Sequence, residues 1–374
     1  MKRNAVIDMT HGPLLGKILL FSLPLMASNI LQLLFNAADI VVVGRFAGSA
    51  SLAAVSSTVS VISLFTQLLI GLSVGINVVI ARYLGLGGQG KEISRTLHTA
   101  VLVAMIGGVA LGAVGILSSD WVLDLTGVPD DVRPLALLYM RIYFIGTPFT
   151  MLYNYGAAAL RAAGDTRRPL FFLMVSGMVN VVLNLISVIV LHMDVKGVAL
   201  ATVISQAVSA VLVLLCLSQT MGDLHFSWSQ LCLDKHRLLD MAHVGIPAGI
   251  QSCLFSLSNV VIQGAINSYG STIIAAVGAA SSIESFIYIA MNSFHQAAQT
   301  FISQNLGAGK YDRIGRVLRI CLLSTLGIGI SLSALTVLLV HPLIGIYNGD
   351  PAVIQAGAER LYIVASVYVI FGIA

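Results

Sequence analysis

The stretch that decides the fold is residues 14–43, LLGKILLFSLPLMASNILQLLFNAADIVVV, in which only Lys17 and Asp39 carry a charge. About 20 mostly apolar residues are enough for a helix to cross the hydrocarbon core of a bilayer. A run longer than this, with no turn signal inside it, predicts a membrane-spanning helix that is tilted or bent.

The composition of the whole chain agrees with this prediction. Of the 374 residues, 57% are hydrophobic and 10% are charged, and the mean hydropathy is +0.93. A soluble globular protein carries about 25% charged residues, so this chain is predicted to have lipid as its main solvent. The four cysteines show no close-paired metal spacing, and we expect no metal site.

Apolar runs of spanning length recur along the chain, separated by polar residues or by Gly and Pro. They cover residues 14–43, 51–82, 96–119, 133–158, 168–192, 196–219, 238–267, 272–304, 315–341 and 353–374. The predicted fold class is an all-α membrane protein, a polytopic bundle with about ten transmembrane helices.

The positive charges predict how the chain is oriented. With a cytoplasmic N-terminus, 15 of the 20 Lys and Arg residues, from Lys2 and Arg3 to Arg319, fall in cytoplasmic segments. Three fall in outer loops, and Arg141 and Arg360 lie inside spans near their outer ends. Such a bias follows the positive-inside rule. The net charge of +4 therefore reflects membrane orientation, and no nucleic-acid partner is expected.

Short matches at a nearly constant offset indicate an internal repeat. Pro24 matches Pro247, SLAAVSS at 51 matches IIAAVGA at 273, and RIYFIG at 141 matches RLYIVA at 360. Parallel repeats of this kind are typical of carriers with a cavity between two halves.

The repeat predicts the domain organisation. We expect a six-helix N-terminal lobe over residues 1–220, a cytoplasmic linker over 221–237 and a C-terminal lobe over 238–374. The C-terminal lobe has four of its six expected helices, so the repeat predicts about 65 further residues after Ala374.

Polar side chains recur at helical spacing inside the spans, where they are functional candidates when they face the protein interior. In the first span, Ser28, Gln32, Asn36 and Asp39 are spaced 4, 4 and 3 and share one helix face. Other stripes are Ser252, Ser256, Asn259 and Gln263; Glu284, Tyr288, Asn292, His295 and Gln299; Asn180 and Asn184; and Thr202, Ser205 and Ser209. Such Ser and Thr residues often only hold helices together, and Glu284 can instead be hydrated at an outer end.

Four motifs resemble those of multidrug and toxic compound extrusion (MATE) transporters. They are FNAADIVVVGRFAG from residue 35, LRAAGDTRRPL from 160, GVALATVISQ from 197 and FISQNLGAGK from 301. The resemblance covers essentially the whole chain. It implies two six-helix bundles and efflux of organic, often cationic compounds in exchange for H⁺ or Na⁺. It also implies a multi-pass protein of the bacterial cytoplasmic membrane that works as a monomer with no cofactor beyond the coupling ion.

The resemblance also implies site residues. The family's cation site matches Asp39, Asn180 and Thr202, with Asn184 standing where the family often has Asp. The resemblance adds Gln32, Asn36 and Asn154 as residues that line the substrate cavity. From the polar stripe of residues 272–304, Glu284 and Tyr288 complete the predicted substrate-cavity set. Pro24, inside the first span, is the predicted hinge.

Three functions compete for this chain. A cation-coupled exporter of small organic substrates is favoured. A lipid-linked precursor flippase would need several basic residues in its cavity, yet only Arg141 and Arg360 lie within spans. A membrane-embedded enzyme would need clustered carboxylates or Cys and His, and Asp130–Asp131, the one adjacent acidic pair, lies in an outer loop, so the chain is predicted to be no enzyme.

Protons are the favoured coupling ion. Asp39 is the only carboxylate placed deep in the N-terminal lobe, and its predicted neighbours are neutral. Burial of a lone carboxylate disfavours its charged form, which suits binding and release of a proton. Na⁺ would prefer a second carboxylate, which Asn184 does not supply.

Overall fold

A computed structural model describes residues 7–267, 269–347 and 349–371, and these residues form helices and turns without strands. Lys2, Arg3 and Ala374 lie outside the described residues. The helices are α1 Leu14–Phe46, α2 Gly48–Leu86, α3 Gly90–Leu125, α4 Arg133–Ile145, α5 Thr147–Ala162, α6 Arg167–Leu185, the π-helix η2 Ile186–Val190, α7 Asp194–Gln219, the 3₁₀-helix η3 Trp228–Gln230, α8 Lys235–Asn267, α9 Ser271–Gly307, α10 Tyr311–Leu338, α11 Val340–Gly345 and α12 Pro351–Phe371.

Each of the ten predicted spans coincides with a helix or a helix pair. Within the described residues, eight helices are long and apolar enough to cross a membrane. The count is nine if α4 and α5, which meet at 44°, form one bent span. The prediction missed this bend at Gly146, where Pro148 in the first turn of α5 has no N–H to continue the hydrogen bonds of α4. The tenth predicted span corresponds to α12, which is not among these eight or nine.

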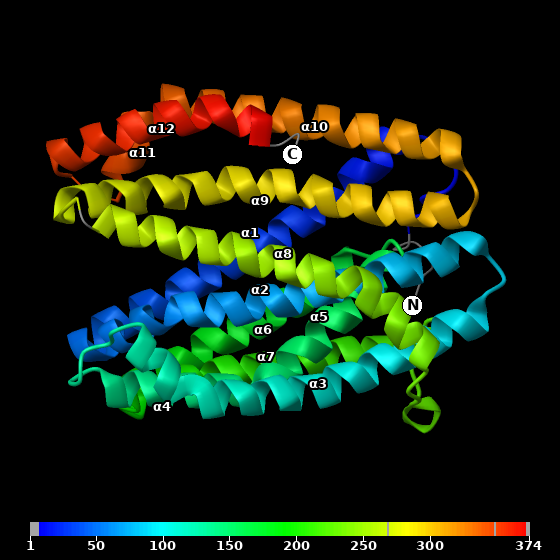
Figure 1. The fold of residues 1–374 in the computed structure, drawn as a ribbon, viewed down its shortest axis with the longest axis horizontal. Helices are drawn as coiled ribbons and strands as arrows, with labels where there is room; N and C mark the ends of the chain where they lie inside the picture. The colour runs from blue at the N-terminus through cyan, green and yellow to red at the C-terminus, as the bar shows by residue number, and fades with distance from the viewer. Residues whose placement is uncertain (1–6, 268, 348, 372–374) are drawn as a thin grey trace.

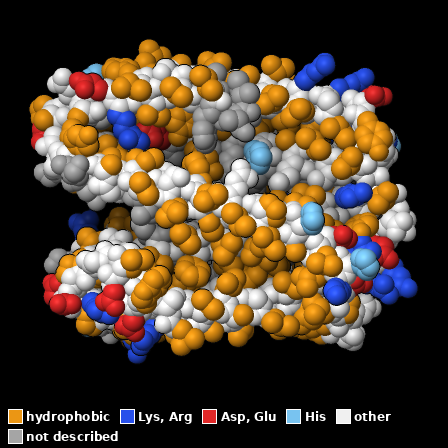
Figure 2. Space-filling model, in the orientation of Figure 1, with side chains coloured by type: hydrophobic (Ala, Val, Ile, Leu, Met, Phe, Trp, Pro, Cys, Tyr) orange, Lys and Arg blue, Asp and Glu red, His pale blue; other side chains and the backbone are white. Residues whose placement is uncertain are grey.

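The surface agrees with a membrane location. In Figure 2, hydrophobic side chains cover the middle of the molecule and most charged side chains gather toward the two ends of its long axis. Large apolar residues such as Leu117, Val261 and Leu323 are exposed. A soluble protein rarely exposes contiguous apolar surface of this extent, so the face indicates contact with lipid.

The helices lie in two layers along the long axis (Figure 1). One layer holds α2 to α7, and the other holds α8, α9, α10 and α12. The predicted linker, residues 221–237, joins α7 to the start of α8, and the division into two lobes stays a prediction. In Figure 2 the face is hollowed between the layers, at the end where α4 and α11 lie.

Helix α1 runs from one layer to the other (Figure 1). Its first half, from Leu14 to Leu25, packs in one hydrophobic cluster with Phe301 of α9 and Val317 of α10. The second half packs against α6 and α7 and near α2. Pro24 lies where the first set of contacts ends. The helix therefore connects two sets of partners through a residue that removes a backbone hydrogen bond.

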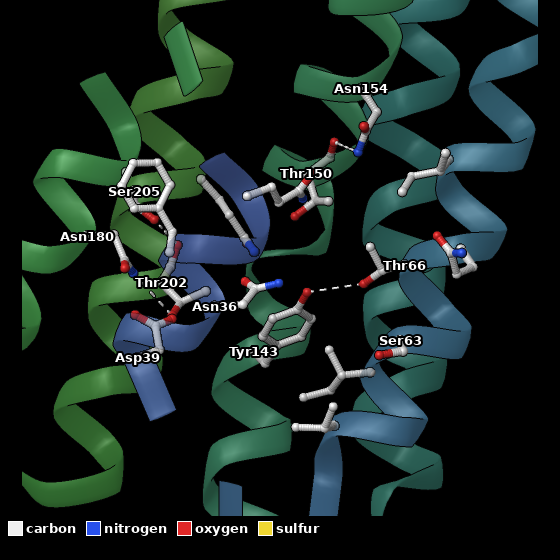
Figure 3. Close-up of a pocket in the computed structure, with 18 of the residues that line it drawn as sticks. Asn36, Asp39, Ser63, Thr66, Tyr143, Thr150, Asn154, Asn180, Thr202 and Ser205 are labelled. Atoms are coloured by element: carbon white, nitrogen blue, oxygen red, sulfur yellow. Dashed lines mark hydrogen bonds between the residues drawn. The ribbon is translucent and has the colours of Figure 1, made fainter. Parts of the chain in front are cut away.

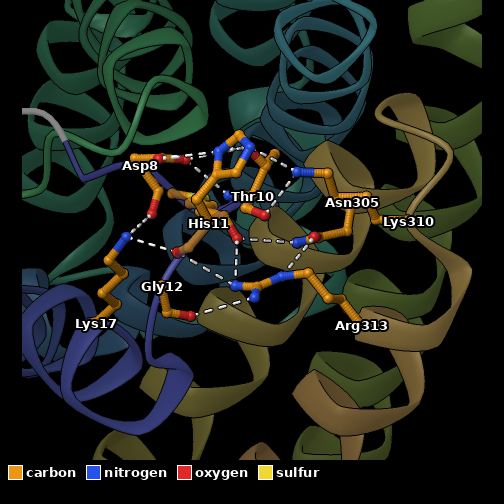
Figure 4. A network of polar contacts seen from close by, with 9 residues as sticks. Asp8, Thr10, His11, Gly12, Lys17, Asn305, Lys310 and Arg313 are labelled. Atoms are coloured by element: carbon orange, nitrogen blue, oxygen red, sulfur yellow. Dashed lines mark hydrogen bonds and ion pairs between the residues drawn. The ribbon is translucent and has the colours of Figure 1, made fainter.

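The segment before α1 is clamped by the start of α10 (Figure 4). Met9 is fully buried, and its carbonyl oxygen accepts hydrogen bonds from Asn305 Nδ2 (3.2 Å) and Arg313 Nη2 (3.3 Å). Lys310 Nζ donates to the carbonyl oxygen of Thr10 at 3.0 Å. These bonds attach the N-terminal segment to the layer of α9 and α10.

The LRAAGDTRRPL motif forms the turn between α5 and α6. Gly164 has a φ of +89°, a conformation that favours glycine. Asp165 is buried, and its Oδ1 accepts the backbone N–H groups of Arg167 (3.2 Å) and Arg168 (3.1 Å) at the start of α6. Burial raises the pKa of the Asp165 carboxyl, while these N–H groups and the Arg168 guanidinium lower it. The motif thus begins α6 at a fixed place and sets the depth of Asn180 and Asn184.

Candidate cation site and transport cavity

A cavity of about 580 Å³ lies between the two layers. Its wall comes from α1, α2 and α4 to α7 on one side and from α8 and α9 on the other. The polar residues that line it are Gln32, Asn36, Asp39, Ser63, Thr66, Gln67, Tyr139, Tyr143, Thr150, Tyr153, Asn154, Ser176, Asn180, Thr202, Ser205, Gln206, Ser209, Ser256, Asn259 and Tyr288. A volume of this size is typical of small-molecule sites.

Asp39 gives the cavity its charge. Among the described residues that line the wall it is the one carboxylic acid, and none of them is Lys, Arg or His. Figure 3 shows Asp39 at the inner surface of α1, close to Asn180 and Thr202. A cavity lined by a single carboxylate and by no basic side chain attracts a cation or a proton.

The carboxylate of Asp39 is held by neutral amides. Asn184 Nδ2 donates to Asp39 Oδ1, and the same group lies 3.3 Å from Asn180 Oδ1. Asn180 Nδ2 in turn lies 3.5 Å from Thr202 Oγ1, whose proton goes to the carbonyl oxygen of Val198 at 3.0 Å. The four residues predicted to form the cation site thus form one connected polar chain across α1, α6 and α7.

Helical spacing and one glycine explain how this chain is assembled. Asn180 and Asn184 are one turn apart and buried on the same face of α6. Gly177, one turn earlier, lies directly against the ring of Phe35, and a Cβ there would overlap the ring. The absence of a side chain lets α1 approach α6 closely enough for Asp39 to reach Asn184.

One oxygen in the site is left over. Asn184 Oδ1 is buried and has no hydrogen-bond partner among the described residues. A buried acceptor without a partner is costly. Because an amide can be turned about its axis, this oxygen can face either a protonated Asp39 or a small cation beside it. The described residues contain no group of three or more His, Cys, Asp or Glu suited to a metal ion.

The structure places four of the five predicted substrate-cavity residues on the wall. Gln32 and Asn36 line it from α1, Asn154 from α5 and Tyr288 from α9. Asn154 Nδ2 donates to the carbonyl oxygen of Thr150 at 2.9 Å, which fixes its orientation. Their role in binding a substrate stays a prediction.

Glu284 differs from the prediction, because it is not among the described residues that line this cavity. Arg360 of α12 binds its carboxylate through Nε to Oε1 (3.0 Å) and Nη2 to Oε2 (3.2 Å). The Glu284 side chain is 12% exposed. The paired geometry satisfies the carboxylate within the second layer and leaves it no free charge to present to the cavity.

Several residues of the wall were not singled out from the sequence. Thr66 Oγ1 and Tyr143 Oη lie 3.3 Å apart and bridge α2 and α4, as Figure 3 shows. Phe255 of α8 stacks on Tyr288 of α9, with ring centroids 6.2 Å apart and an interplanar angle of 13°. The tyrosines Tyr139 and Tyr143, one turn apart in YMRIY from residue 139, were a signal that could have been used.

The family model MatE matches residues 24–186 and 247–374. The two matched segments begin at Pro24 and Pro247, the prolines that the internal repeat pairs. Together they cover well over half of the chain. The chain belongs to the MatE family. Members of this family are transporters, and the chain is accordingly a multi-pass membrane transporter for small molecules and no enzyme.

Relatives of this MatE chain carry transport names. A probable multidrug resistance protein of Bacillus subtilis is 29% identical over 362 residues, covering 94% of this chain and 78% of that protein. An FAD transporter of Shewanella oneidensis is 27% identical over 368 residues, covering 92% of this chain and 78% of that protein.

A solved structure has the same fold. An outward-facing multidrug resistance transporter of the MATE family superposes with a TM-score of 0.89 at 21% identity. The match covers 100% of this chain and 83% of that one. At this identity the likeness concerns the fold alone.

Proposed function

We propose that this MatE transporter exports small organic, often cationic compounds in exchange for a coupling cation, by alternating access of the cavity to the two sides of the membrane. The observation that carries the proposal is the charge of the cavity, in which Asp39 is the one carboxylate among the described lining residues and none of them is Lys, Arg or His. A coupling ion and an organic cation that compete for one carboxylate cannot both occupy it. Binding of one then favours release of the other, which is the requirement for antiport.

The coupling ion is proposed to be H⁺ rather than Na⁺. Asp39 has amide and hydroxyl neighbours, and no second carboxylate is among the described residues that line the cavity with it. A proton needs one basic oxygen, whereas Na⁺ needs several hard oxygen ligands at once. The unpartnered Asn184 Oδ1 would accept the hydrogen of a protonated Asp39 once the amide is turned.

A lipid-precursor flippase is less well supported. A polyanionic headgroup needs basic side chains in the cavity, and none lines its described wall. The two candidates named from the sequence are Arg141, which is bound to Asp120, and Arg360, which is bound to Glu284. The same argument applies to phosphate-bearing cargo of the kind that the Shewanella relative is named for.

We further propose that the N-terminus is cytoplasmic and that the chain lies in a bacterial cytoplasmic membrane as a monomer. The charge bias supports this orientation. With it, the hollow at the end of α4 and α11 opens outward, and the ends of α2 and α9 near residues 87–89 and 308–310 lie at the cytoplasm.

The proposal is tested in proteoliposomes loaded with a fluorescent organic cation. An imposed pH gradient in sodium-free buffer should drive dye movement against its own gradient, and a protonophore should abolish it. Dye movement driven by a sodium gradient alone, with no response to pH, would replace H⁺ by Na⁺. No dye movement under either gradient would contradict cation-coupled export.

A further inference from the structure

On the proposed cytoplasmic side of the cavity, α2 meets α8 and α9 with almost no side chains between the backbones. A Cβ added to any of several glycines there would overlap the facing backbone. The glycine contacts pair Gly71 with Gly249, Gly75 with Met241, Gly245 with Leu72, Gly85 with Gln304 and Gly307 with Arg82. These contacts join α2 to α8 and α9 and close the cavity at the end opposite the hollow.

Buried hydrogen bonds cross the same junction. Asn77 of α2 is anchored within its own layer, where its Nδ2 donates to the carbonyl oxygen of Ala158 in α5 at 3.2 Å. Its Oδ1 lies 3.0 Å from Thr300 Oγ1 of α9. One turn further along α9, Gln304 Nε2 donates to the carbonyl oxygen of Ala162 at 2.7 Å. Asn77, Thr300 and Gln304 are 6%, 2% and 7% exposed.

We name Asn77, Thr300 and Gln304 the inner clasp. Each member satisfies a polar group that would otherwise be buried without a partner, so the clasp favours the packed arrangement. When the helices part and water enters, the donor and the acceptor of each bond become hydrated. The net loss of free energy is therefore small. Bonds of this kind suit a junction that must open and close repeatedly.

We propose that the inner clasp is the lock of the cytoplasmic gate, whose release lets the cavity open to the cytoplasm. The proposal rests on the alternating access proposed above. It extends that function from the Asp39 site to a second group of residues, none of which is among the described residues that line the cavity. Asn77 and Thr300 belong to helices, α2 and α9, that also carry cavity residues, which gives a direct path from an occupied cavity to the gate.

The matched variants are Thr300→Val and Thr96→Val. Both threonines are buried, at 2% and 0% exposure, and each hydroxyl contacts a carbonyl oxygen one turn back in its own helix. Thr300 alone of the two also contacts a side chain from the other half, Asn77. The pair therefore separates loss of the clasp from loss of a buried hydroxyl.

The gate is followed with spin labels at positions 91 and 311, in a cysteine-free background and in lipid nanodiscs. Lys91 and Tyr311 are exposed and lie at the starts of α3 and α10, on the side of the junction that would part. Pulsed dipolar spectroscopy should show the ratio of long to short label distances rise about threefold to tenfold in Thr300→Val. Thr96→Val should leave the ratio unchanged.

Gln304→Leu provides a second clasp variant, and it should shift the distances in the same direction as Thr300→Val. Equal distance distributions in both Thr variants, with equal melting temperatures, would overturn the lock. A distance shift of the same size in Thr96→Val would overturn it as well. The measurement needs no transport, so failure of the vesicle experiment to show dye export leaves this result interpretable.

Discussion

Asp39 and Glu284 are two carboxylates in long apolar helices, and their surroundings differ in the way that matters for function. Glu284 meets a guanidinium with two short contacts, so its charge is compensated within the protein. Asp39 meets neutral amides and faces the cavity. A charge that has its own partner contributes to structure, whereas an uncompensated one can exchange partners with solvent ions and protons. Under the proposed function, the partner, and not burial alone, decides which carboxylate serves transport.

The largest effect is expected from Asp39→Asn. The amide keeps the shape of the side chain and removes its ability to bind a proton, so uphill export driven by a pH gradient should fall to background. Binding of dye, measured by fluorescence polarisation, should persist with lower affinity. Glu284→Gln is the matched control and should retain pH-driven export. Full export by Asp39→Asn would remove the distinction between the two carboxylates.

Asn184→Asp should change the ion that is used. A second carboxylate next to Asp39 gives Na⁺ the additional charged ligand that the natural site lacks. Export driven by a sodium gradient alone is expected to rise about tenfold over the natural protein, in line with the gain from an added charged ligand. Dye flux is measured for the variant and for the natural protein at the same sodium gradients, with the pH held constant. An unchanged sodium response would mean that the site geometry, rather than its charge, excludes Na⁺.

The sequence predicted the surroundings of Asp39 better than those of Glu284. The spacing of Gln32, Asn36 and Asp39 on one helix face, and of Asn180 and Asn184 on another, is a local pattern that helical geometry reads directly. The family resemblance then placed the two helix faces at one predicted site, and in the structure Asn184 donates to Asp39. The partner of Glu284 is Arg360, 76 residues away, and no local pattern specifies such a contact.

The same reasoning explains the other differences. The contact of Thr66 with Tyr143 joins positions 77 residues apart, and the position of Tyr143 depends on the break between α4 and α5. Pro148 was visible in the sequence. A proline near the middle of an apolar run, however, is compatible with one kinked helix as well as with two separate helices. Only the packing of the neighbouring helices decides between the two.

Arg360→Gln should destabilise the fold, because it leaves the Glu284 carboxylate without its counter-charge. Removing one partner of a fully buried pair costs about 3–5 kcal/mol. Arg360 is 30% exposed, so we expect about 1–3 kcal/mol here. Thermal unfolding in detergent should show a lower melting temperature, and the double variant Glu284→Gln/Arg360→Gln should recover most of the loss. Asp39→Asn should lower the melting temperature by less than Arg360→Gln does, and the reverse order would contradict the assignment of structural and functional roles.

The smallest effect is expected from Pro24→Ala. This variant tests whether the helix that carries Asp39 must bend at its proline for transport. The first half of α1 packs on α9 and α10 and its second half holds Asp39 against α6, with Pro24 where the first set of contacts ends. Alanine restores the backbone hydrogen bond and stiffens this connection. Folding and dye binding should remain nearly intact while turnover in vesicles falls several-fold.

Pro247→Ala, the substitution at the repeat-related position in α8, is the matched control, because α8 carries no acidic residue that lines the described cavity wall. Equal slowing by both variants would show that bending of these helices serves the fold in general and has no special link to the Asp39 site.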